Sequence, residues 1–117
     1  MSLDLVSIRR RFHMYPELSF EEVETSNYIV EVLKSLGLNP VRFAKTGVYV
    51  DIGQDEEQNK IIAFRADIDA LPVQELSDVE YKSKIEGKMH ACGHDVHATV
   101  ALGLAEKLAN YKDDLKG

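Results

Sequence analysis

The stretch IIAFRADIDALP (61–72) predicts the class of the fold. Its first four residues form a continuous apolar run, which is typical of a strand covered on both faces of a sheet. Two shorter β-branched and aromatic runs, 41–43 and 48–52, precede it and are separated by turn residues. We therefore expect three strands, 41–43, 48–52 and 61–66, with the last at the centre of an α/β sheet flanked by helices.

Helical patterns lie on the N-terminal side of these strands. Leu5, Ile8 and Phe12 share one helical stripe, and Pro16 limits that helix. The pair Ser19 and Glu22 has the spacing of a capping box and predicts a second helix starting there. Gly37, followed by Pro40, predicts its end.

A third helix is expected from Asp95, which we interpret as its N-cap. The stripe Val96, Val100, Leu104 and Leu108 would face the core, with alanines nearby for close packing. The segment 71–89 between the strands and this helix shows no clean periodicity. It is interpreted as a long connecting loop, with room for a short strand.

Composition narrows the functional classes. The chain has 117 residues, 44% of them hydrophobic, which suits one globular domain. A net charge of −6 argues against nucleic-acid binding. No apolar stretch is long enough for a membrane span, and one cysteine fits a reducing compartment, so we expect a cytoplasmic protein.

The densest group of chemically active side chains lies in the run HACGHDVH (90–97). A cysteine thiolate and a histidine at C-x-H spacing can reach one borderline-soft divalent ion, so Cys92 and His94 are the expected metal ligands. His97 lies one helical turn further on and is interpreted as a supporting or structural residue, while His90 is placed outside the ligand set. Taken singly, Cys92 would be interpreted as a small buried hydrophobic residue and each histidine as an ordinary polar residue.

A second group follows the expected central strand, where α/β sheets place ligand sites. Asp67 and Asp69 share one face of an extended chain, so one could orient a metal-bound histidine while Arg65 holds the other. Asp69, nearer the loop, is the better catalytic candidate. The alternative is an ordinary ion pair at a strand end. His13 is more often structural than catalytic in such a position.

Four motifs together resemble a known family. They are RRRFHMYPELSFEE (9–22), TGVYVDIG (46–53), FRADIDALPVQE (64–75) and MHACGHDVHAT (89–99). The chain is similar to the metal-dependent amidohydrolases that include hippurate hydrolase, N-acetyldiaminopimelate deacetylase and plant auxin-conjugate hydrolases, relatives of the aminoacylase and carboxypeptidase metallopeptidases.

The resemblance implies a fold, an activity and site residues. Residues 1–117 would be the N-terminal portion of a zinc-peptidase-like, three-layer catalytic domain with a mixed central sheet. The activity would be hydrolysis of the amide bond of small N-acyl amino acids with two divalent metals (Zn, Mn, Ni or Co). Cys92 and His94 would bind metal, and Asp69 would assist catalysis.

The same resemblance implies that the site is incomplete here. In relatives the base glutamate, the remaining ligands and a smaller dimerising domain follow the position of Gly117. We therefore expect a homodimer in the full-length protein and no activity in the chain by itself. Two alternatives stay open: a hydrolase that uses Cys92 as nucleophile, and a small, non-catalytic metal-binding or interaction domain.

Overall fold

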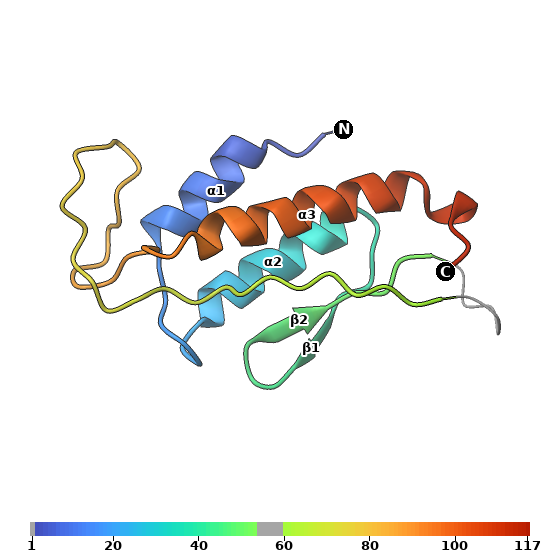
Figure 1. Ribbon diagram of the computed structural model, residues 1–117, viewed down its shortest axis with the longest axis horizontal. Coiled ribbons are helices and arrows are strands. Elements are labelled where there is room, and N and C mark those ends of the chain that lie inside the picture. Colours follow the sequence, from blue (N-terminus) through green and yellow to red (C-terminus); the bar gives the residue numbers. More distant parts are fainter. Residues whose placement is uncertain (1, 54–59) are drawn as a thin grey trace.

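The computed structural model describes residues 2–53 and 60–117 (Figure 1). In this part of the chain, α1 (Leu5–Met14), α2 (Val23–Ser35) and α3 (His94–Asn110) lie together, with a hairpin of β1 (Val41–Phe43) and β2 (Gly47–Tyr49) beside α2. A short 3-10 turn, η1 (Lys112–Asp114), follows α3. No helix in these ranges combines the length and apolar character needed to cross a bilayer.

Helix α1 forms where the apolar stripe predicts it. Asp4 caps its start by accepting a hydrogen bond from the backbone N–H of Ser7 at 3.1 Å. Ile8 and Phe12 are buried, whereas Leu5 is 39% exposed. The prediction of this helix is confirmed.

The start of α2 differs from the predicted capping box. The helix begins at Val23, and Glu17 accepts hydrogen bonds from the backbone N–H groups of Glu24 and Thr25, at 3.2 and 2.6 Å. The carboxylate of Glu22 accepts from the hydroxyl of Thr46 at 3.1 Å, and within the described residues it makes no hydrogen bond that caps the helix. An acceptor several residues upstream therefore replaces the expected local pair.

The end of α2 agrees with the prediction. Gly37 has a φ of 78°, and the backbone N–H groups of Gly37 and Leu38 donate to the carbonyl oxygens of Lys34 and Leu33. This is a Schellman motif, in which a residue with positive φ closes the last turn. Leu38 is buried directly after it.

The core lies between the three helices. Its buried members come from all of them and from the residue after α2: Ile8, Phe12, Val32, Leu33, Leu38, Ala98, Leu102 and Ala105. The contribution of α3 comes from Ala98, Leu102 and Ala105, whereas Val96 and Val100 are 43% and 50% exposed. The expected core stripe that begins with Val96 and Val100 is therefore wrong, because the face that carries Leu102 and its neighbouring alanines is the one packed inward.

The expected three-stranded sheet is formed only in part. β1 and β2 pair antiparallel, with Val41 opposite Tyr49, and β2 is shorter than the predicted 48–52. The segment 61–69 is not assigned to a strand and has no ladder partner among the described residues, and Ile61 and Ile62 are each 92% exposed. Its expected central position in a sheet is thus not realised here, because no strand is present beside it to accept its backbone hydrogen bonds.

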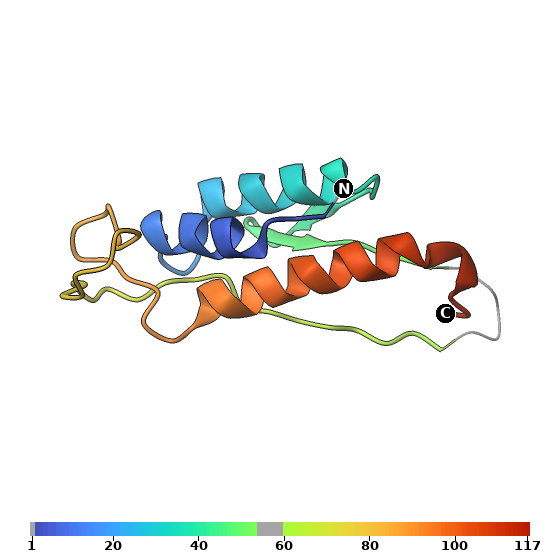
Figure 2. The ribbon, with the colours of Figure 1, turned by 90° about the horizontal axis from the view of Figure 1, so that it is seen from above.

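The segment 60–69 nevertheless has a defined place. It runs alongside α3, as both ribbon views show (Figures 1 and 2). Two isolated bridges fix its far end: Leu18 pairs parallel with Ala70, and Leu71 pairs antiparallel with Met89. The segment between Leu71 and Met89 forms the long loop that the sequence predicts. The bridges bring the end of 60–69 next to the start of α3.

Candidate metal centre

The two groups of candidate residues meet at the start of α3. His94 Nδ1 lies 2.9 Å from both the carbonyl oxygen and carboxylate Oδ1 of Asp69. Both partners are acceptors, so Nδ1 carries the proton and donates, and the lone pair is left on Nε2. The side chain of His94 is 22% exposed. His94 is therefore held in one orientation with the lone pair of Nε2 on its other side.

Asp67 lies on the Nε2 side of His94. Its Oδ2 is 3.9 Å from Nε2, and its Oδ1 accepts a hydrogen bond from Arg65 Nη2 at 3.2 Å. Both members of that pair are exposed, so it contributes little to stability. The sequence predicts that one aspartate contacts the histidine and the other contacts Arg65. In the structure Asp69 contacts His94 and Asp67 contacts Arg65.

Cys92 and Gly93 form the turn before α3. The thiol of Cys92 is exposed, and no hydrogen bond joins it to a histidine within the described residues. Gly93 has a φ of 87° and its carbonyl accepts from Val96 and His97, so a residue with left-handed backbone starts the helix. His97 is exposed, with its ring centroid 6.0 Å from that of His94.

A shallow cavity of about 360 Å³ lies beside this cluster. Residues of the extended segment and of α3 line it: Phe64, Arg65, Ala66, Asp67, His97 and Val100. The cavity is lined by both polar groups and exposed apolar side chains, and it lies next to the predicted ligands.

The donor set fits a borderline-soft divalent ion only in part. A free thiol and an oriented imidazole nitrogen are the ligand types that such ions take. Among residues 2–53 and 60–117, however, no group of three His, Cys, Asp or Glu side chains is arranged to hold a metal. Cys92 and His94 therefore suit the ion chemically but do not complete its coordination.

His90 has an unusual environment. It is buried, and neither ring nitrogen has a hydrogen-bond partner among residues 2–53 and 60–117. Burial lowers the pKa of His90 below its ordinary value of 6.5, although the nearby carboxylate of Asp95 acts in the opposite direction. The ring is thereby favoured in its neutral form.

Asp95 is not the N-cap that the sequence suggests. It lies in the first turn of α3, is 1% exposed, and directs Oδ2 at His13 and Arg9. His13 also contacts Glu75, and no sequence pattern indicates a contact between these residues, which are 62 positions apart. A charged side chain in a loop is usually exposed to solvent, so no local sequence pattern identifies Glu75 as buried.

Comparisons with known proteins show the family to which the chain belongs. Residues 63–117 match the model of peptidase family M20/M25/M40. The chain is 50% identical to N-acetyl-L-cysteine deacetylase of Bacillus subtilis and 49% identical to IAA-amino acid hydrolase ILR1-like 5 of Arabidopsis thaliana, in each case over 97% of this chain. The chain belongs to the M20 peptidase family.

A solved M20 structure has the same arrangement. The Bacillus subtilis YXEP protein, described as a dinuclear metal binding peptidase from the M20 family, superposes with a TM-score of 0.90 at 43% identity over 97% of this chain. The chain covers 32% of that structure and 26 and 27% of the two relatives above, in their N-terminal part. The predicted family is confirmed, and the fold is that of the N-terminal part of an M20 structure.

Proposed function

We propose that this chain supplies two metal ligands and one supporting carboxylate to a site that hydrolyses the amide bond of N-acyl amino acids. The observation that carries the proposal is the contact of Asp69 with His94 Nδ1, because it leaves Nε2 free on the side of Asp67. The names of relatives support the substrate class: one is an N-acetyl-L-cysteine deacetylase and another an N-acyl-L-amino acid amidohydrolase of Geobacillus stearothermophilus.

The roles of the residues follow from their contacts. Cys92 would bind through its thiolate and His94 through Nε2, and the complete site would hold two divalent ions, Zn, Mn, Ni or Co. Bound there, the metal would polarise the substrate carbonyl as a Lewis acid. Asp69 acts through His94, because it fixes the orientation and the tautomer of the His94 ring. The assistance to catalysis expected of Asp69 is therefore that of a positioning residue.

The chain spans about a quarter to a third of its relatives, so activity belongs to the full-length protein in this proposal. We expect the base and the remaining ligands to come from other parts of the sequence, and the 117 residues by themselves to be inactive. We also expect a cytoplasmic homodimer, which size-exclusion chromatography with light scattering and cell fractionation would test.

The function is tested with the full-length protein and a panel of N-acetyl amino acids. Chelator treatment should abolish hydrolysis, and Zn, Mn, Ni or Co should restore it. Cys92→Ala and His94→Ala should each lower kcat/KM by more than about 100-fold, above the range of residues that only support a ligand. Lys107→Ala, an exposed change on the same helix, is the control. Full activity without metal, lost on alkylation of Cys92, would point instead to a cysteine nucleophile.

A further inference from the structure

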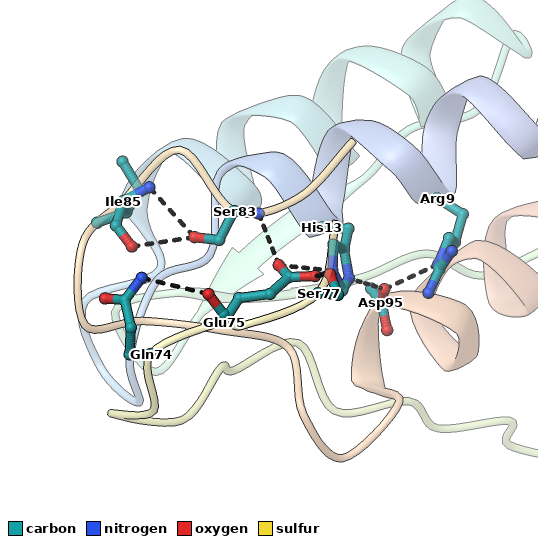
Figure 3. A network of polar contacts seen from close by, with 8 residues as sticks. All are labelled: Arg9, His13, Gln74, Glu75, Ser77, Ser83, Ile85 and Asp95. Atoms are coloured by element: carbon teal, nitrogen blue, oxygen red, sulfur yellow. Dashed lines mark hydrogen bonds and ion pairs between the residues drawn. The ribbon is translucent and has the colours of Figure 1, made fainter. Parts of the chain in front are cut away.

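A chain of buried polar contacts joins the long loop to the first turn of α3 (Figure 3). His13, at the end of α1, directs Nδ1 at Asp95 Oδ2 over 2.8 Å and Nε2 at both carboxylate oxygens of Glu75 over 3.0 Å. The three side chains are 5% exposed or less. Arg9 Nε adds a second contact to Asp95 Oδ2 at 2.9 Å.

The contacts satisfy both ring nitrogens of His13. Each nitrogen faces a carboxylate, Nδ1 that of Asp95 and Nε2 that of Glu75, and all three side chains are buried. Buried polar groups are stable when they are paired in this way.

Glu75 is held from the loop side as well. It accepts from the hydroxyl of Ser77 and, at 2.7 Å, from the backbone N–H of Ser83. Burial by itself would raise the pKa of Glu75, but the hydrogen bonds from Ser77, Ser83 and His13 outweigh it and lower the pKa to about 2. Glu75 is therefore ionised and ties its own loop together.

We propose that His13 is a positioning residue for the metal centre, because by joining Glu75 to Asp95 it fixes the first turn of α3, which carries His94, and the turn before it, which carries Cys92. The inference rests on the proposed function, since it requires Cys92 and His94 to be ligands.

The local geometry explains how His13 acts at a distance. His94 and Asp95 are consecutive, so fixing the carboxylate of Asp95 restrains the backbone on which His94 is mounted. The carbonyl of Asp95 also accepts from the Thr99 hydroxyl at 2.7 Å. The first turn of α3 is thus held from the inner side through Asp95, and from the outer side by Asp69, which contacts His94.

The loop closes the same arrangement. The backbone N–H groups of Leu71 and Met89 each donate to the other's carbonyl oxygen, at 2.9 and 3.0 Å. This pair joins the chain just after Asp69 to the chain just before Cys92. Glu75 lies within the loop that the pair closes, so its contact with His13 stabilises both approaches to the site.

Cobalt binding by the full-length protein tests the inference. The thiolate-to-cobalt charge-transfer absorption reports on Cys92, and Cys92→Ser removes it as a check. His13→Gln and Glu75→Gln should weaken cobalt binding at this site by about 10- to 100-fold and change the ligand-field spectrum, as loss of supporting contacts does at other metal sites. His13→Ala should weaken binding further, because glutamine retains one donor group.

A matched control separates positioning from general stability. Thr46→Val removes a buried hydrogen bond to Glu22, the N-cap residue of α2, which contacts neither the His13 group nor the proposed ligands, and it should lower stability without changing the cobalt spectrum. His13→Gln with wild-type affinity and spectrum would overturn this inference and leave the proposed function standing. Wild-type protein that takes up no cobalt would overturn both.

Discussion

The two sides of the first turn of α3 differ in how complete they are. On the inner side, Asp95 is 1% exposed and meets His13 and Arg9 at hydrogen-bond distance. On the outer side, His94 is oriented by Asp69, but Cys92 is exposed and no three ligands converge within the described residues. The inner contacts are made within the described residues, whereas the outer side holds only part of the proposed metal site.

This difference shows where sequence changes should act on stability and where on chemistry. A partner removed from the inner side leaves a buried charge without compensation, which is costly. A change on the outer side alters groups that water already reaches, so it should affect binding more than folding.

The largest expected effect on folding is that of Asp95→Ala in the full-length protein. It leaves Arg9 and the ring of His13 without their carboxylate, and should cost about 3–5 kcal/mol in the free energy of unfolding. Denaturant unfolding measures the loss. Asp4→Ala, which removes only the exposed cap of α1, should cost much less. Equal losses for both variants would contradict the contrast between the two sides.

Acid should weaken the inner side through Glu75. Its folded pKa of about 2 lies below the ordinary value of 4.5, so its stabilisation is complete above about pH 4.5 and lost as the pH falls toward about 2. Glu75→Gln should cost about 2 kcal/mol near neutral pH. Unfolding of both proteins between about pH 6 and pH 3 should show this difference shrinking. A constant difference would mean that the Glu75 charge is not what stabilises the loop.

A smaller effect is expected from Asp69→Asn on the outer side. The amide oxygen and the backbone carbonyl can still accept from His94 Nδ1, so metal affinity should fall by only about tenfold. Titration with a competing chelator measures it, with thermal unfolding in parallel. A drop in stability without a change in metal affinity would place Asp69 in the scaffold instead.

The smallest effect is expected from Gly93→Ala. Its φ is 87° and nothing lies within 4 Å of an added Cβ, so only backbone strain of about 1 kcal/mol should result. Gly37→Ala, with a φ of 78° and equally open space, is the matched change at the end of α2. Both should lower stability alike in denaturant unfolding, but only the Gly93 variant should alter metal affinity.

Local patterns predict the parts of the fold that local contacts decide. Leu5, Ile8 and Phe12 place α1, and Gly37 places the end of α2, because periodicity and positive φ act within one or two turns. The start of α2 is mispredicted because Glu17 reaches it from upstream. The face of α3 is mispredicted because apolar residues occur around much of this helix, and tertiary packing buries the face of Ala98, Leu102 and Ala105.

The candidate site shows the same division. Cys92, His94 and Asp69 stand out because their spacing follows a strand-like run and starts a helix, and the structure brings Asp69 onto His94. Their catalytic and ligand roles stay predictions. The sequence favours a structural role for His13, but its contact with Glu75 escapes detection because that contact is purely tertiary, made across 62 positions.

The adjacency of His94 and Asp95 has a consequence for insertions and deletions. The side chains of successive helical residues point about 100° apart. His94 therefore serves the outer side of the turn and Asp95 the inner side, with no residue between them. Gain or loss of a single residue after Gly93 would rotate a carboxylate toward solvent and an imidazole into the protein interior. The length of this segment should therefore tolerate less variation than most of its side chains.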